Sequence, residues 1–548
     1  MFQEFTSAKF FNWASGLVII VSSLLLLFNP ALMPANFSDI SFHLSAAQGF
    51  NRAGGLVTWD FWEAAPTGRP FIYPPAFQIF LSFLLTLGLP PLLIIKLVSF
   101  LIYPLALFLV WSSAKKLFKP LVAFLATIFL AHSFFFMVLA TTTVPGTLVV
   151  ALTPLALVFL ERKKYWSVFF LLVIFWYSHM ILPYFSVLAL LAFGWFNQRQ
   201  EFKKIILVVF GSYLVFLPWL FWILINLDYL KYLSVPSPFE TGNSDAAFDL
   251  IIPFLSGLGL LVSFIWWREE RLVQKLLPFL VWAFSMLIFI PYYPERFFNN
   301  AGLVPLVIFL AVFFYLILAK ISHFWTKIGI GALLFILFLV EILLVHLPEQ
   351  KPTLKLVPAA WPLLIRYAWA EQPDKNLGPY TAGNLKLAQT IMAQSQVDDI
   401  FWSTTSVFEH LSYTPGTQVI IANFFGSLTG RAVANARLPE FFSPALWQPL
   451  PINQAKLVLA ELKQTPFWSG QRSVEEQKIS EILASDFELI GQNEILYLYK
   501  NKSSQVTKVV PVKPVVPSWL AYLILLGLIL GAFVPSGWLR KYRIFFKT

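Results

Sequence analysis

The chain has 548 residues, of which 58% are hydrophobic and only 12% are charged, against about 25% charged residues in an average soluble domain. Apolar runs near the spanning length of about 20 residues recur from end to end, which excludes a soluble protein and predicts a polytopic membrane protein. The chain contains no cysteine, which excludes disulfides, thiolate catalysis and cysteine-ligated metals. The net charge of +11 comes in short basic clusters between apolar runs, a pattern typical of cytoplasmic anchors rather than of nucleic-acid binding.

A first span is predicted at 10–28, after a short cytoplasmic segment, because this apolar run is longer than the core of a typical signal peptide. An outer loop follows at 31–91. Within it we expect a helix at 39–51 that ends at the pair Gly54-Gly55. The helix is indicated by residues that share one face at helical spacing: Ile40, His43, Leu44 and Ala47.

The next apolar segment, 73–89, is short and carries the pair Pro74-Pro75 near its start. It either crosses the bilayer or lies as a helix in the outer leaflet. If it crosses, the basic clusters around Lys115 and Arg162 fall outside; if it does not, every basic cluster is cytoplasmic. Because cytoplasmic loops carry the excess of Lys and Arg, we predict a non-crossing helix. This places both termini in the cytoplasm and the first loop outside the plasma membrane.

This topology predicts an α-helical polytopic membrane protein with about twelve spans, an interfacial helix and a small extracytoplasmic α/β domain near the C-terminus. We expect a transmembrane module at 1–346, an outer domain at 347–517 with a proline-rich linker at 506–517, and the last span with a basic tail at 518–548. The spans after the first are expected at 92–112, 121–139, 144–160, 166–177, 181–196, 205–225, 250–266, 276–290, 301–318, 328–345 and 519–534.

The outer domain is recognised by a change of composition, since charged residues, Gln, Asn and Pro become frequent after residue 346 and apolar runs shorten. Its length of about 170 residues is that of one domain. Short apolar runs predict strands at 419–422 and 495–499. Helical spacing predicts amphipathic helices at 454–464 and 474–484.

The sequence lacks the common signatures of soluble enzymes: a phosphate-binding Gly-Lys-Ser/Thr loop, His-Glu-x-x-His and Gly-x-Ser-x-Gly. The candidates are therefore polar residues at the outer membrane face. Asp39, at the start of the outer helix, either deprotonates an acceptor hydroxyl or amine or holds a cation, or it only stabilises the helix N-terminus. His43 lies one turn further along, where it either shares this site or is structural.

The same loop carries three more charged residues, Asp60, Glu63 and Arg69, which either bind substrate or are solvated. Tyr73 stands before the two prolines that open the next helix and is a further substrate-binding candidate.

Two candidates lie outside the first loop. Arg296 stands in Tyr-Tyr-Pro-Glu-Arg at the outer ends of two spans. Its planar guanidinium suits phosphate oxygens; alternatively it pairs with Glu295 or with lipid headgroups. His179 separates two short spans, where it either binds substrate or only satisfies local backbone groups.

The order of these features resembles the GT-C superfamily of membrane glycosyltransferases, and in particular a bacterial and archaeal branch with the same first-loop motifs. The likeness covers about residues 1–345, with a looser one at 427–431, and it rests on order rather than on any single motif. The features are Ser-Asp-Ile-Ser-Phe-His-Leu at 38–44, Gly-Gly-Leu-Val-Thr-Trp-Asp at 54–60, Tyr-Pro-Pro-Ala-Phe at 73–77, Ala-Lys-Lys-Leu-Phe at 114–118, Glu-Arg at 295–296, and the small outer α/β domain.

The resemblance implies an inverting transfer of a sugar from a polyprenyl-phosphate carrier to a glycan, lipid or protein acceptor. Asp39 then matches the catalytic acidic residue and Arg296 a basic residue near the carrier phosphate. Many members carry a second acidic residue in the next outer loop, but here 140–146 reads Ala-Thr-Thr-Thr-Val-Pro-Gly. Either the enzyme works without a metal, or Asp60 or Glu63 substitutes, or the protein is a non-catalytic relative. A divalent cation is thus allowed but not required, and no metal ligand is assigned.

Two other functions compete with a transferase. A transporter or flippase of a lipid-linked substrate usually carries charges inside its spans near the midplane, whereas here Lys96 and Glu341 lie near span ends. A non-catalytic envelope scaffold predicts that Asp39 can be replaced without effect.

Overall fold

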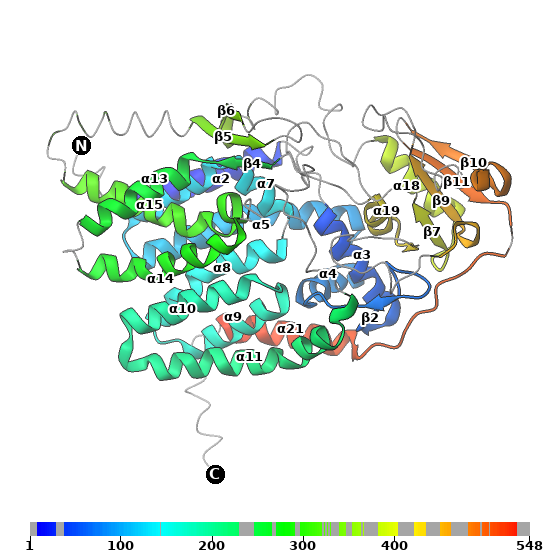
Figure 1. Cartoon of the computed structure of the whole chain (residues 1–548), viewed down its shortest axis with the longest axis horizontal. Helices are drawn as coiled ribbons and strands as arrows, with labels where there is room; N and C mark the ends of the chain where they lie inside the picture. The colour runs from blue at the N-terminus through cyan, green and yellow to red at the C-terminus, as the bar shows by residue number, and fades with distance from the viewer. Residues whose placement is uncertain are drawn as a thin grey trace, which may run out of the picture.

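A computed structural model shows a bundle of long helices beside an α/β part, with the first outer loop between them (Figure 1). The description covers residues 8–28, 38–142, 144–229, 246–265, 270–290, 296–320, 339–346, 353–362, 382–403, 421–434, 450–461, 481–493, 496–503, 505–533 and the single positions 323, 326, 329 and 365.

The bundle follows the apolar runs of the sequence. Among the residues that the structure describes, four helices are long and apolar enough to cross a membrane: α2 (Ala8–Leu27), α5 (Pro91–Leu117), α8 (Val144–Glu161) and a stretch that ends with α11 (Phe202–Ile225). Further apolar helices are α9 (Tyr165–Ser178), α10 (Leu182–Asn197), α13 (Ile251–Ile265), α14 (Glu270–Met286), α15 (Leu303–Lys320) and α21 (Ser518–Phe533). The protein is therefore a helical membrane protein, and the count of about twelve spans stays a prediction.

The span expected at 121–139 is not one helix. It consists of α6 (Pro120–His132) and α7 (Phe134–Thr142), which are bent by 79° against each other. Ser133 has an extended backbone and ends α6, and its hydroxyl accepts a hydrogen bond from the Phe136 amide at 3.2 Å, as an N-cap does. The apolar run continues through the bend, so hydropathy does not reveal it.

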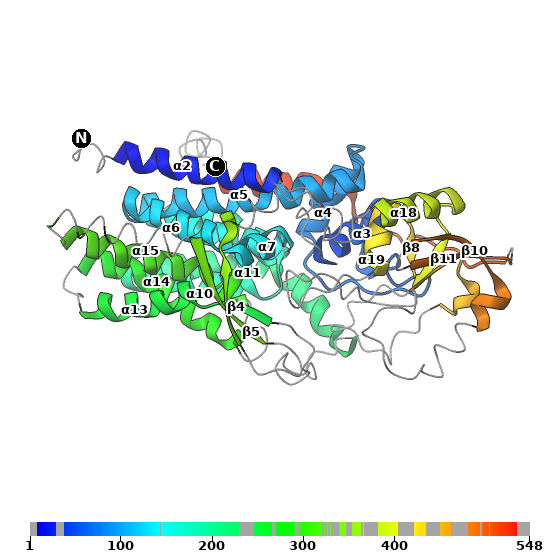
Figure 2. The same cartoon turned by 90° about the horizontal axis from the view of Figure 1, so that it is seen from above.

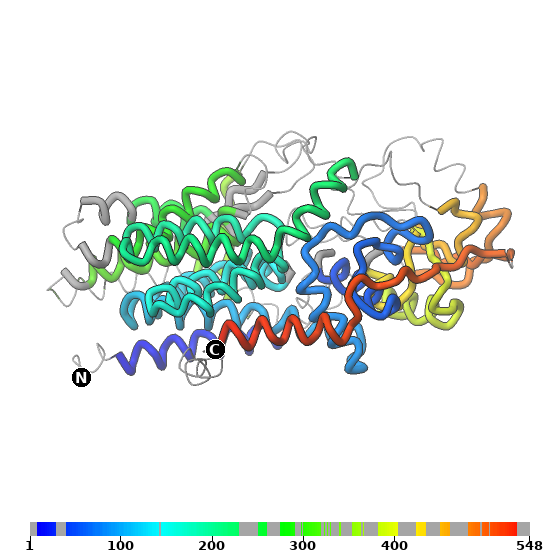
Figure 3. Tube along the Cα trace, turned by 90° about the horizontal axis from the view of Figure 1, so that it is seen from below, coloured from blue at the N-terminus to red at the C-terminus, as the bar shows by residue number. Residues whose placement is uncertain are grey.

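The last helix, α21, returns from the α/β part to the bundle. Figure 3 shows the chain before it running along the α/β part and then turning into α21. Just before α21, β12 (Val516–Pro517) pairs with β1 (Gly55–Leu56) of the first outer loop. Gly55 has no room for a side chain, since an added Cβ would lie 2.1 Å from the Val516 carbonyl oxygen. The segment after α3 and the segment before α21, which are more than 400 residues apart, thus meet at the end of the bundle that faces the α/β part.

The first outer loop folds as the helix α3 (Ser38–Ala53), the short strands β1, β2 (Trp59–Asp60) and β3 (Arg69–Pro70), and the helix α4 (Ala76–Thr86). Gly54, at φ +79°, turns the chain out of α3, as expected from the glycine pair. α4 has 11 residues and is therefore about 16 Å long, which is too short for a hydrocarbon core of about 30 Å. It packs on α3 and α21, and the non-crossing helix stays a prediction.

The α/β part is built on a five-stranded sheet in the order β10 (Phe487–Gln492), β11 (Leu496–Asn501), β9 (Leu457–Glu461), β7 (Ile400–Ser403) and β8 (Ala432–Val433). β7 is parallel to both β8 and β9, and the other pairs are antiparallel. Two helices accompany the sheet: α18 (Ala382–Gln394) and α19 (Ile421–Thr429). α19 lies between the sheet and α3, as Figure 2 shows.

Two of the elements expected in this part are wrong and a third is confirmed. Within 454–464, Leu457–Glu461 is a strand rather than a helix, because it is the central strand and is buried on both faces. Within 419–422, Ile421 and Ala422 begin α19 instead of forming a strand, since so short an apolar run does not distinguish the two. The strand expected at 495–499 is β11. Of the helix expected at 474–484, only 481–484 is described, and it is helical; the rest lies outside the described residues.

A second sheet corrects the span expected at 328–345. Val340–His346 is the strand β5, which pairs with β4 (Ala246–Asp249) on one side and β6 (Thr353–Pro358) on the other. A run of β-branched and aliphatic residues satisfies the hydropathy of a span and the propensity of a strand equally well. The expected boundary between 346 and 347 falls inside this β5–β6 hairpin. Most of 328–338 lies outside the described residues.

Candidate active site at the outer end of the bundle

The helix α7 contacts the elements that carry the two charged candidates, Asp39 and Arg296. Asp39 lies in the first turn of α3, and Arg296 begins the π-helical turn η6 (Arg296–Asn300). α7 contacts both α3 and η6. The structure describes the backbone of Asp39 and of Arg296. Their side chains lie outside the described part of the structure.

His43 is on α3, one turn after Asp39, and is buried with 2% of its surface exposed. Gln78 of α4 donates its side-chain amide to His43 Nδ1 at 2.8 Å, which leaves the ring proton on Nε2. Burial lowers the pKa of His43 to about 3. The imidazole is therefore neutral at physiological pH.

Aromatic contacts bring His43, Tyr73 and His179 together. The ring centroid of Tyr73 lies 4.9 Å from that of His43 and 6.3 Å from that of His179. The segment before Tyr73 is held in place by two indole N–H groups, since Trp222 donates to the Phe71 carbonyl at 3.0 Å and Trp219 to the Ile72 carbonyl at 3.3 Å.

His179 also has a structural task. Its Nδ1 accepts hydrogen bonds from the amides of Ile181 and Leu182, both at 3.2 Å, at the start of α10. This is the alternative in which His179 satisfies local backbone groups. The ring also contacts Tyr73, and its Cδ2 lies close to Gly146, where an added Cβ would approach to 3.2 Å.

Asp60, Glu63 and Arg69 are not solvated loop charges. Their exposed fractions are 5%, 0% and 3%, and they face one another. Arg69 Nε lies 3.3 Å from Asp60 Oδ2, and Arg69 Nη2 lies 3.6 Å from Glu63 Oε2. The other carboxylate oxygen of Asp60 accepts from the backbone amides of Trp62 at 3.2 Å and Glu63 at 3.0 Å. This geometry favours a role in holding the loop over direct contact with substrate.

Burial raises the pKa of Glu63 well above its usual value, and the negative charge of Asp60 raises it further, against the opposing effect of Arg69. In the cluster, Arg69 therefore pairs most closely with Asp60, and burial favours the neutral form of Glu63. An enclosed carboxyl group whose neutral form is favoured is a poor cation ligand.

The sequence did not point to several polar residues that the structure brings to this region. Gln78 is one of few polar residues in an apolar helix, and that isolation is a usable signal. Gln48 donates to the Ser427 carbonyl at 2.7 Å, and its partner lies in another domain, so no local pattern reveals the contact. Among the described residues, no group of three or more His, Asp and Glu could hold a metal ion.

Comparison with known structures identifies the architecture. The crystal structure of ArnT from Cupriavidus metallidurans in the apo state aligns with 90% of this chain and 99% of its own length, with a TM-score of 0.55 and 12% identity. The archaeal oligosaccharyltransferase AglB from Archaeoglobus fulgidus, in complex with an inhibitory peptide and a dolichol-phosphate, aligns with 82% of this chain and 69% of its own length, with a TM-score of 0.52 and 11% identity. No protein-family model and no curated protein matches the sequence. At these identities the likeness concerns the fold, which is the GT-C fold expected from the sequence.

Proposed function

We propose that the protein is a membrane glycosyltransferase that moves a sugar from a polyprenyl-phosphate carrier to an acceptor on the extracytoplasmic face. One observation carries the proposal: on a GT-C fold, α7 contacts both the helix whose first turn holds Asp39 and the turn that begins with Arg296. A carboxylate and a guanidinium at one end of the bundle are what transfer from a phosphate carrier requires. One structural neighbour, AglB, was solved with a dolichol-phosphate, which is a lipid phosphate of the proposed class.

The proposed reaction is a single displacement with inversion. An acceptor oxygen or nitrogen forms a bond to the anomeric carbon while the bond between that carbon and the phosphate oxygen breaks. Asp39 takes the proton of the acceptor. The electron pair of the broken bond stays on the carrier phosphate, whose charge Arg296 stabilises.

His43, Tyr73 and His179 are proposed to form an uncharged wall of the donor site, with Gln78 fixing the His43 ring. Aromatic side chains with a polar tip suit a sugar that presents both C–H and hydroxyl groups. Asp60, Glu63 and Arg69 were substrate-binding candidates in the sequence. They are proposed to support this wall without contacting the substrate.

The test uses the full chain reconstituted in liposomes with a panel of polyprenyl-phosphate sugars and candidate acceptors, with Mg²⁺, with Mn²⁺ and with chelator. Release of the carrier phosphate is followed. We expect Asp39→Asn to lower the rate by about 10²- to 10⁴-fold, the usual contribution of a general base. The matched control is Asp228→Asn, because Asp228 is an exposed carboxylate in the short turn after α11.

Each outcome decides a different point. Equal turnover by wild type and Asp39→Asn keeps the transferase and assigns the proton transfer to another residue. Rates that depend on the divalent cation would add a metal to the proposal. No turnover with any donor and acceptor contradicts the transferase and favours the transport or scaffold function.

A further inference from the structure

α3 is enclosed on every side, although its sequence is only partly apolar. Every residue from Ile40 to Phe50 is buried, including the polar ones: Ser41, His43, Ser45 and Gln48. The helix contacts α4, α5, α7 and β1 of the membrane module and α19 of the α/β part. The position of its first turn, with Asp39, is therefore set by its neighbours and not by solvent.

The contact between α3 and α19 is close because small residues meet there. A Cβ added to Gly426 would lie 3.5 Å from Ser45 Oγ and 2.8 Å from Val433 Cγ2. One residue further, the Ser427 carbonyl accepts the Gln48 hydrogen bond. Glycine at 426 thus allows α3, α19 and β8 to approach one another at a single point.

The segment 60–69, which carries the buried charges, forms backbone hydrogen bonds with β8. The Val433 amide donates to the Trp62 carbonyl at 2.8 Å, and the Ala65 amide donates to the Val433 carbonyl at 3.0 Å. Asp60 shapes this segment by accepting the amides of Trp62 and Glu63. Asp60 of β2 and Arg69 of β3 are paired residues of these neighbouring strands, which stand at the two ends of the segment.

Glu63 stands where these parts meet. It faces Asp60 and Arg69 of its own segment, and the Ser45 side chain of α3 lies close enough to lower its pKa, against the larger effect of burial. Two buried carboxylates against one guanidinium would leave a net negative charge in the interior, which is costly. Burial and the charge of Asp60 raise the pKa of Glu63, which favours its neutral form and lowers that cost.

We propose that the Asp60–Glu63–Arg69 cluster is a positioning device: it locks α3 against β8 of the outer domain, and the outer domain thereby holds the Asp39 turn at the active site. Glu63 is the positioning residue that joins the three parts. This inference rests on the proposed function for the role of Asp39, but the mechanical coupling is measurable without it.

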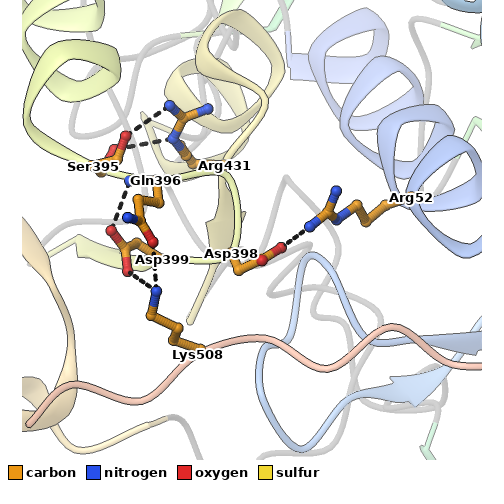
Figure 4. Close-up of polar contacts among 7 residues, drawn as sticks. All are labelled: Arg52, Ser395, Gln396, Asp398, Asp399, Arg431 and Lys508. Carbon is orange, nitrogen blue, oxygen red and sulfur yellow. Dashed lines mark hydrogen bonds and ion pairs between the residues drawn. The ribbon is translucent and has the colours of Figure 1, made fainter.

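The Asp60–Glu63–Arg69 cluster is buried near the contact between α3 and the α/β part. A second set of charges lies at the exposed edge of this contact, which is called the rim below. At the rim, Arg52 at the end of α3 pairs with Asp398 (Figure 4), and their side chains are 38% and 39% exposed. Exposed pairs of this kind contribute little because both ions stay solvated when the pair breaks. Arg52 therefore provides a control on the same helix and against the same domain.

The first experiment is amide hydrogen exchange of α3 in the purified full chain. Two variants are designed to disrupt the packing of α3. Glu63→Ala removes the buried carboxyl group, and Gly426→Ala adds a methyl group of α19 that would clash with β8 while the charged residues stay unchanged. Both are expected to raise exchange in α3 by about tenfold or more relative to wild type. Glu63→Gln, which keeps the shape of a neutral carboxyl group, and Arg52→Gln are expected to stay within about twofold.

The second experiment measures turnover of the same variants. Displacement of a catalytic group by about 1 Å lowers kcat by about 10²-fold, and we expect this loss for Glu63→Ala, with donor KM nearly unchanged and Glu63→Gln close to wild type. If Glu63→Gln loses as much activity as Glu63→Ala, the ionised carboxylate acts directly and the proposal is overturned. Unchanged α3 exchange in both Glu63→Ala and Gly426→Ala overturns it as well. If wild type shows no turnover, the exchange data alone decide the coupling, and the failure belongs to the proposed transferase.

Discussion

Two sets of charges lie where the first loop meets the α/β part, and they look alike in sequence and differ in surroundings. In the interior, Asp60 and Arg69 form an ion pair that is at most 5% exposed and is joined by Glu63. At the rim, Arg52 and Asp398 form an ion pair across the same interface with more than a third of each side chain exposed. Both pairs join an arginine to an aspartate, so burial decides how much the loss of one partner changes the free energy of unfolding.

The rim is also more extended than a single pair. Figure 4 shows that Asp399, next to Asp398, contacts Lys508 at 3.7 Å and the Gln396 amide at 2.7 Å. Arg431 lies nearby and donates to the Ser395 carbonyl at 2.9 Å and the Ser395 hydroxyl at 3.0 Å, which ties the end of α18 to the turn before β8. These contacts lie within the α/β part, whereas the segment that carries the interior cluster hydrogen-bonds with β8 through the backbone of Trp62 and Ala65.

The largest effect is expected from breaking the interior pair on one side. Arg69→Met removes the cation and leaves the Asp60 carboxylate buried among polar groups that cannot neutralise it. We expect the free energy of unfolding to fall by about 3–5 kcal/mol, seen as a lower midpoint of thermal unfolding followed by tryptophan fluorescence. The double variant Arg69→Met/Asp60→Asn, which removes both charges, should recover a large part of the loss. A loss below about 1 kcal/mol for Arg69→Met would show that the cluster is solvated.

A smaller effect is expected from pH, because burial raises the pKa of Glu63 in the folded protein. Its folded pKa is raised above the unfolded value of 4.5, so its contribution to stability is fully present below pH 4.5 and is lost as pH rises through the folded pKa. The unfolding midpoint of Glu63→Gln should therefore fall less than that of wild type as pH rises from 4.5 through the folded pKa. The groups that face Glu63 are Asp60, Arg69 and the Ser45 hydroxyl, and none of them is changed in the comparison. Parallel pH curves for the two proteins would contradict a raised pKa.

The smallest effect is expected at the rim. Arg52→Gln should change the free energy of unfolding by less than about 1 kcal/mol, and the difference should shrink further at high salt. Asp398→Asn should behave in the same way, and the double variant should add nothing. A loss comparable to that of Arg69→Met would place the lock at the rim and remove the contrast between the two charge sets.

Local features predicted the bundle well. The spans expected at 144–160, 166–177 and 181–196 differ from α8, α9 and α10 by one residue at most at either end, because the length and ends of an apolar run are visible in the sequence itself. The helix expected at 39–51 is α3 for the same reason. The order of motifs also led to the GT-C fold, which the comparison with solved structures confirms.

Contacts between distant segments decided the rest. The strands β5 and β9 and the enclosure of α3 depend on partners that lie far away in the chain, so the same apolar residues fit more than one element until those partners are in place. The charges of the first loop show this most directly. The sequence by itself determined that Asp60, Glu63 and Arg69 lie in one polar segment that follows Asp39 in the chain. Only the tertiary structure decided that they are buried and that their segment hydrogen-bonds with Val433, which lies far along the chain, because such contacts between distant segments leave no local pattern.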